Sequence, residues 1–217
     1  MKLPIPPKWL DRGPIVLACS GPSLDVERLC RCELPVCAVS TAIRSLFFED
    51  DVSLRYWAVL DPLTEDHGEE GLLALNHPHI LKIISDHDQA KRAGMVHRDF
   101  KVPPRMSGAI QPDVLVFPFD RHDAPGWLSM SLGLWFLISQ GYREIKIAGC
   151  DLTEPNKYHY GERKNSVTKP RWHAFDDAFK SLEYLTSSEI LKDMGVTFRS
   201  WSPDSRINDL MPLVPEM

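Results

Sequence analysis

The 217-residue chain has no apolar run long enough to span a membrane, and Met1–Pro4 lack the layout of a signal peptide. We therefore expect a cytoplasmic protein, with peripheral membrane association and homo-oligomerisation left open. Its formal net charge is −5, whereas surfaces that bind nucleic acid are usually basic, so we expect no nucleic-acid partner. Hydrophobic residues make up 43%, enough for the core of a single domain over residues 1–217.

Several catalytic motifs are also missing. The chain has no G-x-S-x-G elbow, no H-E-x-x-H helix and no C-x-x-C pair, so it gives no support to hydrolase, zinc-protease or dithiol redox chemistry. Cys30 and Cys32 form a C-x-C pair, but no second pair follows at zinc-site spacing. Five cysteines, an odd number, in a chain without an export signal indicate free thiols.

The first apolar stretch, Ile15–Cys19, predicts a buried strand, and the turn Gly21-Pro22-Ser23 leads from it into a helix that ends at Arg31. A strand, turn and helix in this order point backbone N–H groups and a positive helix end at one spot, which suits a phosphate or a nucleotide edge. One glycine matches neither the dinucleotide fingerprint nor the P-loop. A plain connection without a ligand is the alternative.

The rest of the chain continues this alternation, which predicts an α/β fold: a mostly parallel, Rossmann-like sheet with helices on both faces. Ligands of such sheets bind beyond the carboxyl ends of the strands. The polar stretch 152–172 would form a small lid there. Further strands are predicted at 35–40, 55–60, 80–84, 114–117, 144–149 and 196–199, and helices at 41–48, 68–75, 127–140 and 173–194. The residues expected at the strand ends are Gly21, Pro22, Ser23, Ser40, Thr41, Asp61 and Asp151.

Two carboxylates at strand ends could carry chemistry. Asp61 and Asp151 each follow an apolar strand. Such a pair could hold a divalent cation with a nucleotide phosphate, or accept hydrogen bonds from ribose or sugar hydroxyls. The alternative is a turn-forming aspartate, especially for Asp61, which precedes Pro62.

A histidine and two tyrosines are further candidates. His173 opens a predicted helix, whose positive end favours the neutral imidazole that a general base requires. Asp176 and Asp177 follow at the helical spacing that could orient its ring. Tyr158 and Tyr160 lie among basic residues and could bind a leaving phosphate. The alternatives are a surface histidine and a solvated loop.

Four segments, taken together and in order, resemble the bacterial sialyltransferases of glycosyltransferase family 42. They are IVLACSGPSL, SMSLGLWFLISQGYREIKIAGCDL, HAFDDAFKSLEYL and WSPDS. The first two are also similar to a wider group, the motility-accessory-factor glycosyltransferases and their relatives in domain of unknown function 115, which include a pterin diphosphokinase.

The resemblance implies a glycosyltransferase A-like variant of the fold and a nucleotide-sugar-dependent transferase. It would move a sugar from a CMP-activated donor to a glycan or other hydroxyl acceptor, with inversion and no required cofactor. His173 would deprotonate the acceptor, and Tyr158 or Tyr160 would stabilise the departing phosphate. The expected nucleotide-binding residues are Ser20, Gly21, Pro22, Ser23, Ser40, Asp61, Ser129 and Asp151.

The sequence also departs from the sialyltransferases. Ser40 and Asp61 stand where those enzymes carry asparagines, the lid is shorter, and an aspartate before Pro62 is more like the wider group. The wider group implies a diphosphotransferase in which Asp61 and Asp151 hold Mg²⁺. A third hypothesis is a non-catalytic nucleotide-binding protein that kept the fold.

Overall fold

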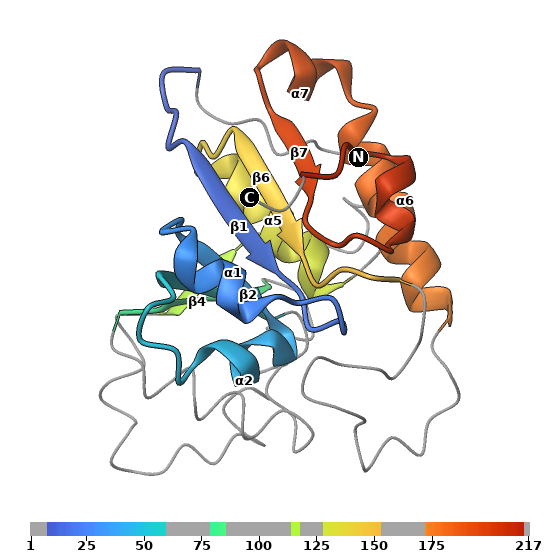
Figure 1. Ribbon diagram of the computed structural model, residues 1–217. Coiled ribbons are helices and arrows are strands. Elements are labelled where there is room, and N and C mark those ends of the chain that lie inside the picture. The colour runs from blue at the N-terminus through green and yellow to red at the C-terminus, as the bar shows by residue number, and fades with distance from the viewer. Residues whose placement is uncertain (1–7, 60–78, 86–113, 118–127, 153–171, 215–217) are drawn as a thin grey trace.

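The structure is a computed structural model that describes residues 8–59, 79–85, 114–117, 128–152 and 172–214 (Figure 1). Its centre is one seven-stranded sheet in the order β5-β4-β3-β2-β1-β6-β7, with every neighbouring pair parallel. The predicted α/β fold with a parallel sheet is therefore confirmed. The strands are β1 (Pro14–Ala18), β2 (Val36–Val39), β3 (Leu54–Val59), β4 (Leu81–Ser85), β5 (Val114–Phe117), β6 (Glu144–Ala148) and β7 (Thr197–Ser200).

The strand order reverses at β1. The chain first builds outwards from β1 through β2 to β5, then returns to place β6 on the other side of β1. In open parallel sheets, ligands bind outside the carboxyl ends of the strands at such a reversal. A ligand site is therefore expected at the carboxyl ends of β1 and β6.

Helices cover both faces of the sheet, as predicted. Alternate side chains of β1 point to opposite faces of the sheet. Ile15 and Leu17 belong to one apolar cluster, and Val16 and Ala18 belong to the other. Because both faces are buried, the strand reads as a continuous apolar run. The first cluster packs against α5 (Ser129–Ser139) and α6 (Trp172–Thr186). The second packs against α1 (Val26–Arg31), the 3₁₀ turn η1 (Ser40–Ala42) and α2 (Ile43–Leu46). Figure 1 shows α1 and α2 in front of the sheet and α5 behind it.

Helix α5 lies directly on the sheet. Nine consecutive residues, 130–138, are buried, which explains why its apolar pattern lacks a polar face. A side chain at Gly133 would place its Cβ 3.0 Å from Leu17 Cδ1, so glycine allows this close packing. Gly141, at φ +88°, ends the helix, and Tyr142 N–H donates to the Leu137 carbonyl at 3.2 Å. The glycine stop predicted from the sequence is confirmed.

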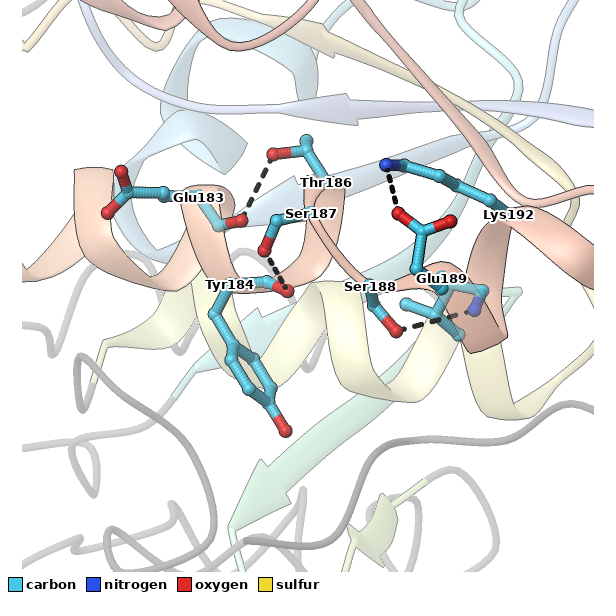
Figure 2. A network of polar contacts seen from close by, with 8 residues as sticks. Glu183, Tyr184, Thr186, Ser187, Ser188, Glu189 and Lys192 are labelled. Atoms are coloured by element: carbon cyan, nitrogen blue, oxygen red, sulfur yellow. Dashed lines mark hydrogen bonds and ion pairs between the residues drawn. The ribbon is translucent and has the colours of Figure 1, made fainter.

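The single helix predicted over 173–194 is wrong, because the structure has two helices there. Helix α6 ends at Thr186, and α7 (Glu189–Asp193) begins after Ser188, whose hydroxyl accepts from Leu191 N–H at 3.3 Å. Figure 2 shows the hydroxyls of Thr186 and Ser187 turned back onto carbonyls of the last turn of α6. Hydroxyl side chains compete with the backbone in this way, so they favour helix ends and caps.

Other elements follow the predictions with shifted ends. The first helix begins at Val26 instead of Ser23, because Asp25 caps it by accepting from Arg28 N–H at 2.8 Å. The helix expected over 68–75 lies outside the described residues. A short 3₁₀ helix, η5 (Arg206–Asp209), was not predicted.

None of the helices in the described ranges is both long and apolar enough to cross a membrane. All five cysteines are free thiols, as expected.

Candidate functional site

Backbone hydrogen bonds join the segments that follow β1 and β6. Beyond the last paired residues, Cys19 N–H donates to the Ala148 carbonyl and Gly21 N–H to the Gly149 carbonyl, both at 2.8 Å. The turn after β1 therefore lies against the segment that follows β6. This places Ser20, Gly21, Pro22 and Ser23 beside the residues leading to Asp151, at the strand reversal.

Asp151 contacts this turn directly. Its Oδ2 accepts a hydrogen bond from Ser23 N–H at 3.0 Å, across 128 positions of the chain. The prediction that the turn and Asp151 share one edge of the sheet is confirmed. The other carboxylate oxygen, Oδ1, makes no hydrogen bond to a described residue, so it is available to a ligand hydroxyl.

Gly21 makes this approach possible. A Cβ at position 21 would overlap the Asp151 carboxylate and would lie 2.5 Å from the Gly149 carbonyl oxygen. The φ of Gly21 is not in the left-handed region, so glycine is needed here for space alone.

The Ser23 hydroxyl is buried and has no hydrogen-bond partner among the described residues. Buried hydroxyls are nearly always paired in folded proteins. Because this one lies beside Asp151, a ligand at the strand ends would supply the missing partner.

Two backbone N–H groups at this spot already have protein acceptors. Asp151 occupies the Ser23 N–H, and Asp25 occupies the Arg28 N–H in the first turn of α1. Helix α1 has only six residues, so it offers little dipole. That this spot binds a phosphate or a nucleotide edge stays a prediction. Because these two N–H groups are already engaged, the geometry favours the hydroxyls or base edge of a nucleoside.

A C-terminal segment, residues 200–209, clamps the end of β6. Ser202 Oγ accepts from Cys150 N–H at 3.0 Å. Ser205 Oγ lies in hydrogen-bond reach of two carbonyls, that of Cys150 and, at 2.9 Å, that of Asp151. It also accepts from Ile207 N–H at 3.2 Å and thereby caps η5. The WSPDS motif, which had no role assigned from the sequence, thus fixes the backbone of Asp151.

We expect Ser205→Ala to destabilise the protein by about 1–3 kcal/mol, because buried backbone groups at the β6 end and in η5 lose their partner. The measurement is urea unfolding at equilibrium. Ser187→Ala is the matched control, since the Ser187 hydroxyl is exposed and bonds only within its own helix end. A loss no larger than that of the control would show that the clamp does not hold β6.

Two further predicted residues, Ser40 and Ser129, also lie at the carboxyl end of the sheet. Ser40 follows β2, the strand beside β1, and has a φ of +47°, unusual for a residue with a side chain. Such strain of about 1–3 kcal/mol gathers at functional sites. Its carbonyl accepts from Trp57 Nε1 at 2.8 Å. Ser129 begins α5, and the next residue, Met130, has its sulfur 3.6 Å from Cys150 Sγ. Both serines therefore belong to the carboxyl end of the sheet.

The Cys150 thiol stays protonated. A hydrogen bond with Cys19, burial and the nearby Asp151 charge raise the pKa of Cys150 well above its ordinary value. Cys150 is therefore neutral across the physiological range and is not a thiolate nucleophile.

His173 lies in the first turn of α6, as predicted. Helix α6 is docked on α5 through a Ser131–Ser181 hydrogen bond of 2.9 Å and a stacked Trp135–Tyr184 pair. Asp176 forms an ion pair of 3.1 Å with Arg206 through Oδ1. That Asp176 or Asp177 orients the histidine ring stays a prediction. Arg206 was not singled out from the sequence.

Three predicted site residues, Asp61, Tyr158 and Tyr160, lie outside the described residues, as does the lid apart from its two ends. In the part of the chain that the structure describes, no three His, Cys, Asp or Glu side chains gather as metal ligands. The proposed Asp61–Asp151 pair thus stays a prediction.

Solved structures share this arrangement of strands and helices. The sialyltransferase CstII from Campylobacter jejuni, in complex with the substrate analogue CMP-3FNeuAc, matches with a TM-score of 0.53 at 17% identity, over 93% of this chain and 86% of that chain. The chain has the fold of the bacterial sialyltransferases. A structure of the same enzyme with a trisaccharide acceptor and CMP gives 0.53 at 16% identity over 93% and 86%. The monofunctional alpha-2,3-sialyltransferase Cst-I from Campylobacter jejuni gives 0.53 at 16% over 92% and 79%.

At these identities the likeness establishes the fold, including its glycosyltransferase A-like variant, and no more. No protein-family model matches the chain, and no curated protein matches it in sequence.

Proposed function

We propose that the chain is a sialyltransferase-like glycosyltransferase, which transfers a sugar from a CMP-activated donor to a hydroxyl of a glycan or other acceptor. The observation that carries the proposal is the contact between Ser23 and Asp151 at the strand reversal. There, Asp151 Oδ1 and the buried Ser23 hydroxyl have no hydrogen-bond partner among the described residues. Solved structures with this fold hold CMP, a CMP-sugar analogue and a trisaccharide acceptor.

The donor would bind by its nucleoside at this edge. Asp151 Oδ1 would accept a hydrogen bond from a ribose or sugar hydroxyl, and Ser23 Oγ would pair with a polar atom of the nucleotide. Because Ser23 N–H and Arg28 N–H already have protein acceptors, the turn suits one nucleotide edge better than a triphosphate.

His173 would act as the general base. The first turn of a helix disfavours a positive charge, which keeps an imidazole neutral and able to accept a proton. As it takes the acceptor hydroxyl proton, the oxygen forms a bond to the anomeric carbon, and the bond from that carbon to the phosphate oxygen breaks. CMP departs with the bonding pair, stabilised by Tyr158 or Tyr160, and attack from the opposite side inverts the anomeric carbon.

A thermal-shift screen of CMP, UDP, GDP and ATP, each with and without Mg²⁺, tests the proposal. A ligand at about 100 times its Kd stabilises the folded state by about 2.7 kcal/mol, which raises the Tm of a chain this size by about 5–10 °C. We expect this response to CMP, with or without Mg²⁺. A Mg²⁺-dependent response to ATP would favour the diphosphotransferase, and silence towards every nucleotide would favour a non-catalytic protein.

A further inference from the structure

Arg206 contacts both the segment that follows β6 and helix α6. Its backbone N–H donates to the Asp151 carbonyl at 3.4 Å, and its Nη1 donates to Asp176 Oδ1 at 3.1 Å. Asp176 lies three residues after His173 on α6, so it sits on the same side of the helix one turn further on. One residue thus joins the end of β6 to the turn of α6 that follows His173.

The guanidinium makes a second contact on α6. Its central carbon lies 4.8 Å from the centre of the Phe179 ring, and Phe179 packs partly buried against the core. A planar guanidinium can stack on a ring while its edge donates to a carboxylate, which a lysine ammonium cannot do. Arg206 therefore contacts α6 at two residues that lie about one helical turn apart, Asp176 and Phe179.

The backbone that carries Arg206 is itself fixed. Ser205 caps η5 and bonds to the β6 end, and Ile207 is fully buried. Asn208 Nδ2 donates to the carbonyls of Ser202 at 3.0 Å and Pro203 at 2.7 Å. The guanidinium thus extends from a rigid base, so its contacts can define where α6 lies.

We propose that Arg206 is a positioning residue that fixes the first turns of α6 relative to Asp151 and thereby sets His173 against the bound donor. The placing of His173 rests on the proposed function; the fixing of α6 does not. The ion pair is partly exposed, at 42% for Arg206 and 57% for Asp176. Exposed pairs contribute little to global stability, so its loss should loosen α6 locally and leave the fold intact.

The first test is hydrogen exchange, read by mass spectrometry over residues 172–180, with Tm and CMP affinity measured alongside. We expect Arg206→Ala to speed exchange there by about tenfold, with Tm within about 4 °C and CMP affinity within about twofold of the original chain. Arg206→Lys should fall between the two, because the charge stays and the stacking is lost. Asp176→Asn should also speed exchange, and combining it with Arg206→Ala should add little, because both changes remove the same pair.

Lys192→Ala is the matched control. Lys192 and Glu189 form a shorter pair of 2.7 Å, with 52% and 78% exposure, on the neighbouring helix α7 (Figure 2). Its loss should leave exchange over 172–180 unchanged. Unchanged exchange in Arg206→Ala, or an equal effect of Lys192→Ala, would overturn the proposal.

The second test is sugar transfer from a CMP-activated donor. Misplacing a catalytic group by about 1 Å can reduce the rate by about a hundredfold, so we expect kcat of Arg206→Ala to fall about ten- to a hundredfold at an unchanged KM for the donor. If His173→Ala abolishes transfer but Arg206→Ala leaves kcat unchanged, the positioning role of Arg206 is refuted. A chain that neither binds CMP nor transfers sugar would contradict the proposed function, and the exchange experiment would still decide whether Arg206 fixes α6.

Discussion

We expect His173→Ala to abolish sugar transfer from a CMP-activated donor while leaving CMP affinity within about twofold. A general base contributes about 10²- to 10⁴-fold to the rate, and its loss affects the proton transfer without touching the nucleotide. The measurement is kcat for transfer, together with calorimetric titration of CMP.

His79→Ala is the control for this prediction. His79 precedes β4, so it lies at the amino end of the sheet, opposite the edge that carries Asp151. Its replacement should leave both kcat and CMP affinity unchanged. Undiminished turnover in His173→Ala would remove the histidine from the mechanism, and a parallel loss of CMP affinity would make it a binding residue instead.

We expect Gly21→Ala to lower CMP affinity by more than about tenfold and to destabilise the fold by about 1–3 kcal/mol. The added Cβ would overlap the Asp151 carboxylate and crowd the Gly149 carbonyl oxygen. Neither neighbour can move aside easily. The Gly149 carbonyl accepts a hydrogen bond from Gly21 N–H, and the Asp151 carbonyl accepts one from Ser205 Oγ. Calorimetric titration with CMP and urea unfolding measure the two effects.

Gly195→Ala separates the crowding from the general effect of replacing a glycine. Gly195 has a φ of +74° and nothing within 4 Å of an added Cβ, so its replacement should cost about 1 kcal/mol of backbone strain. It should leave CMP affinity unchanged. Equal affinities for the two alanine variants would show that the turn at Gly21 is not part of the nucleotide site.

Much of the fold follows from local patterns. Strand β1 is recognisable because a strand buried on both faces is a continuous apolar run, and α5 because Gly141 stops an apolar helix. The break between α6 and α7 was missed because the amphipathic pattern continues through it. The hydroxyls of Ser187 and Ser188 were the available signal, since serines favour helix ends.

The site was only partly predictable. Asp151 and the Gly21 turn could be brought together, because parallel strands present their carboxyl ends at one edge and both residues follow strands. The clamp by Ser202 and Ser205 was not foreseen, because it depends on how the chain beyond β7 folds back onto the segment after β6. No local pattern encodes such a contact, and the same holds for the Arg206 pair.

The central claim is that CMP binds where β1 and β6 end, and hydrogen exchange with and without CMP tests it most directly. We predict slower exchange over residues 19–24 and 149–152, which carry Ser23 and Asp151, and no change over α7. Absence of CMP binding, or protection confined to other segments, would contradict the account.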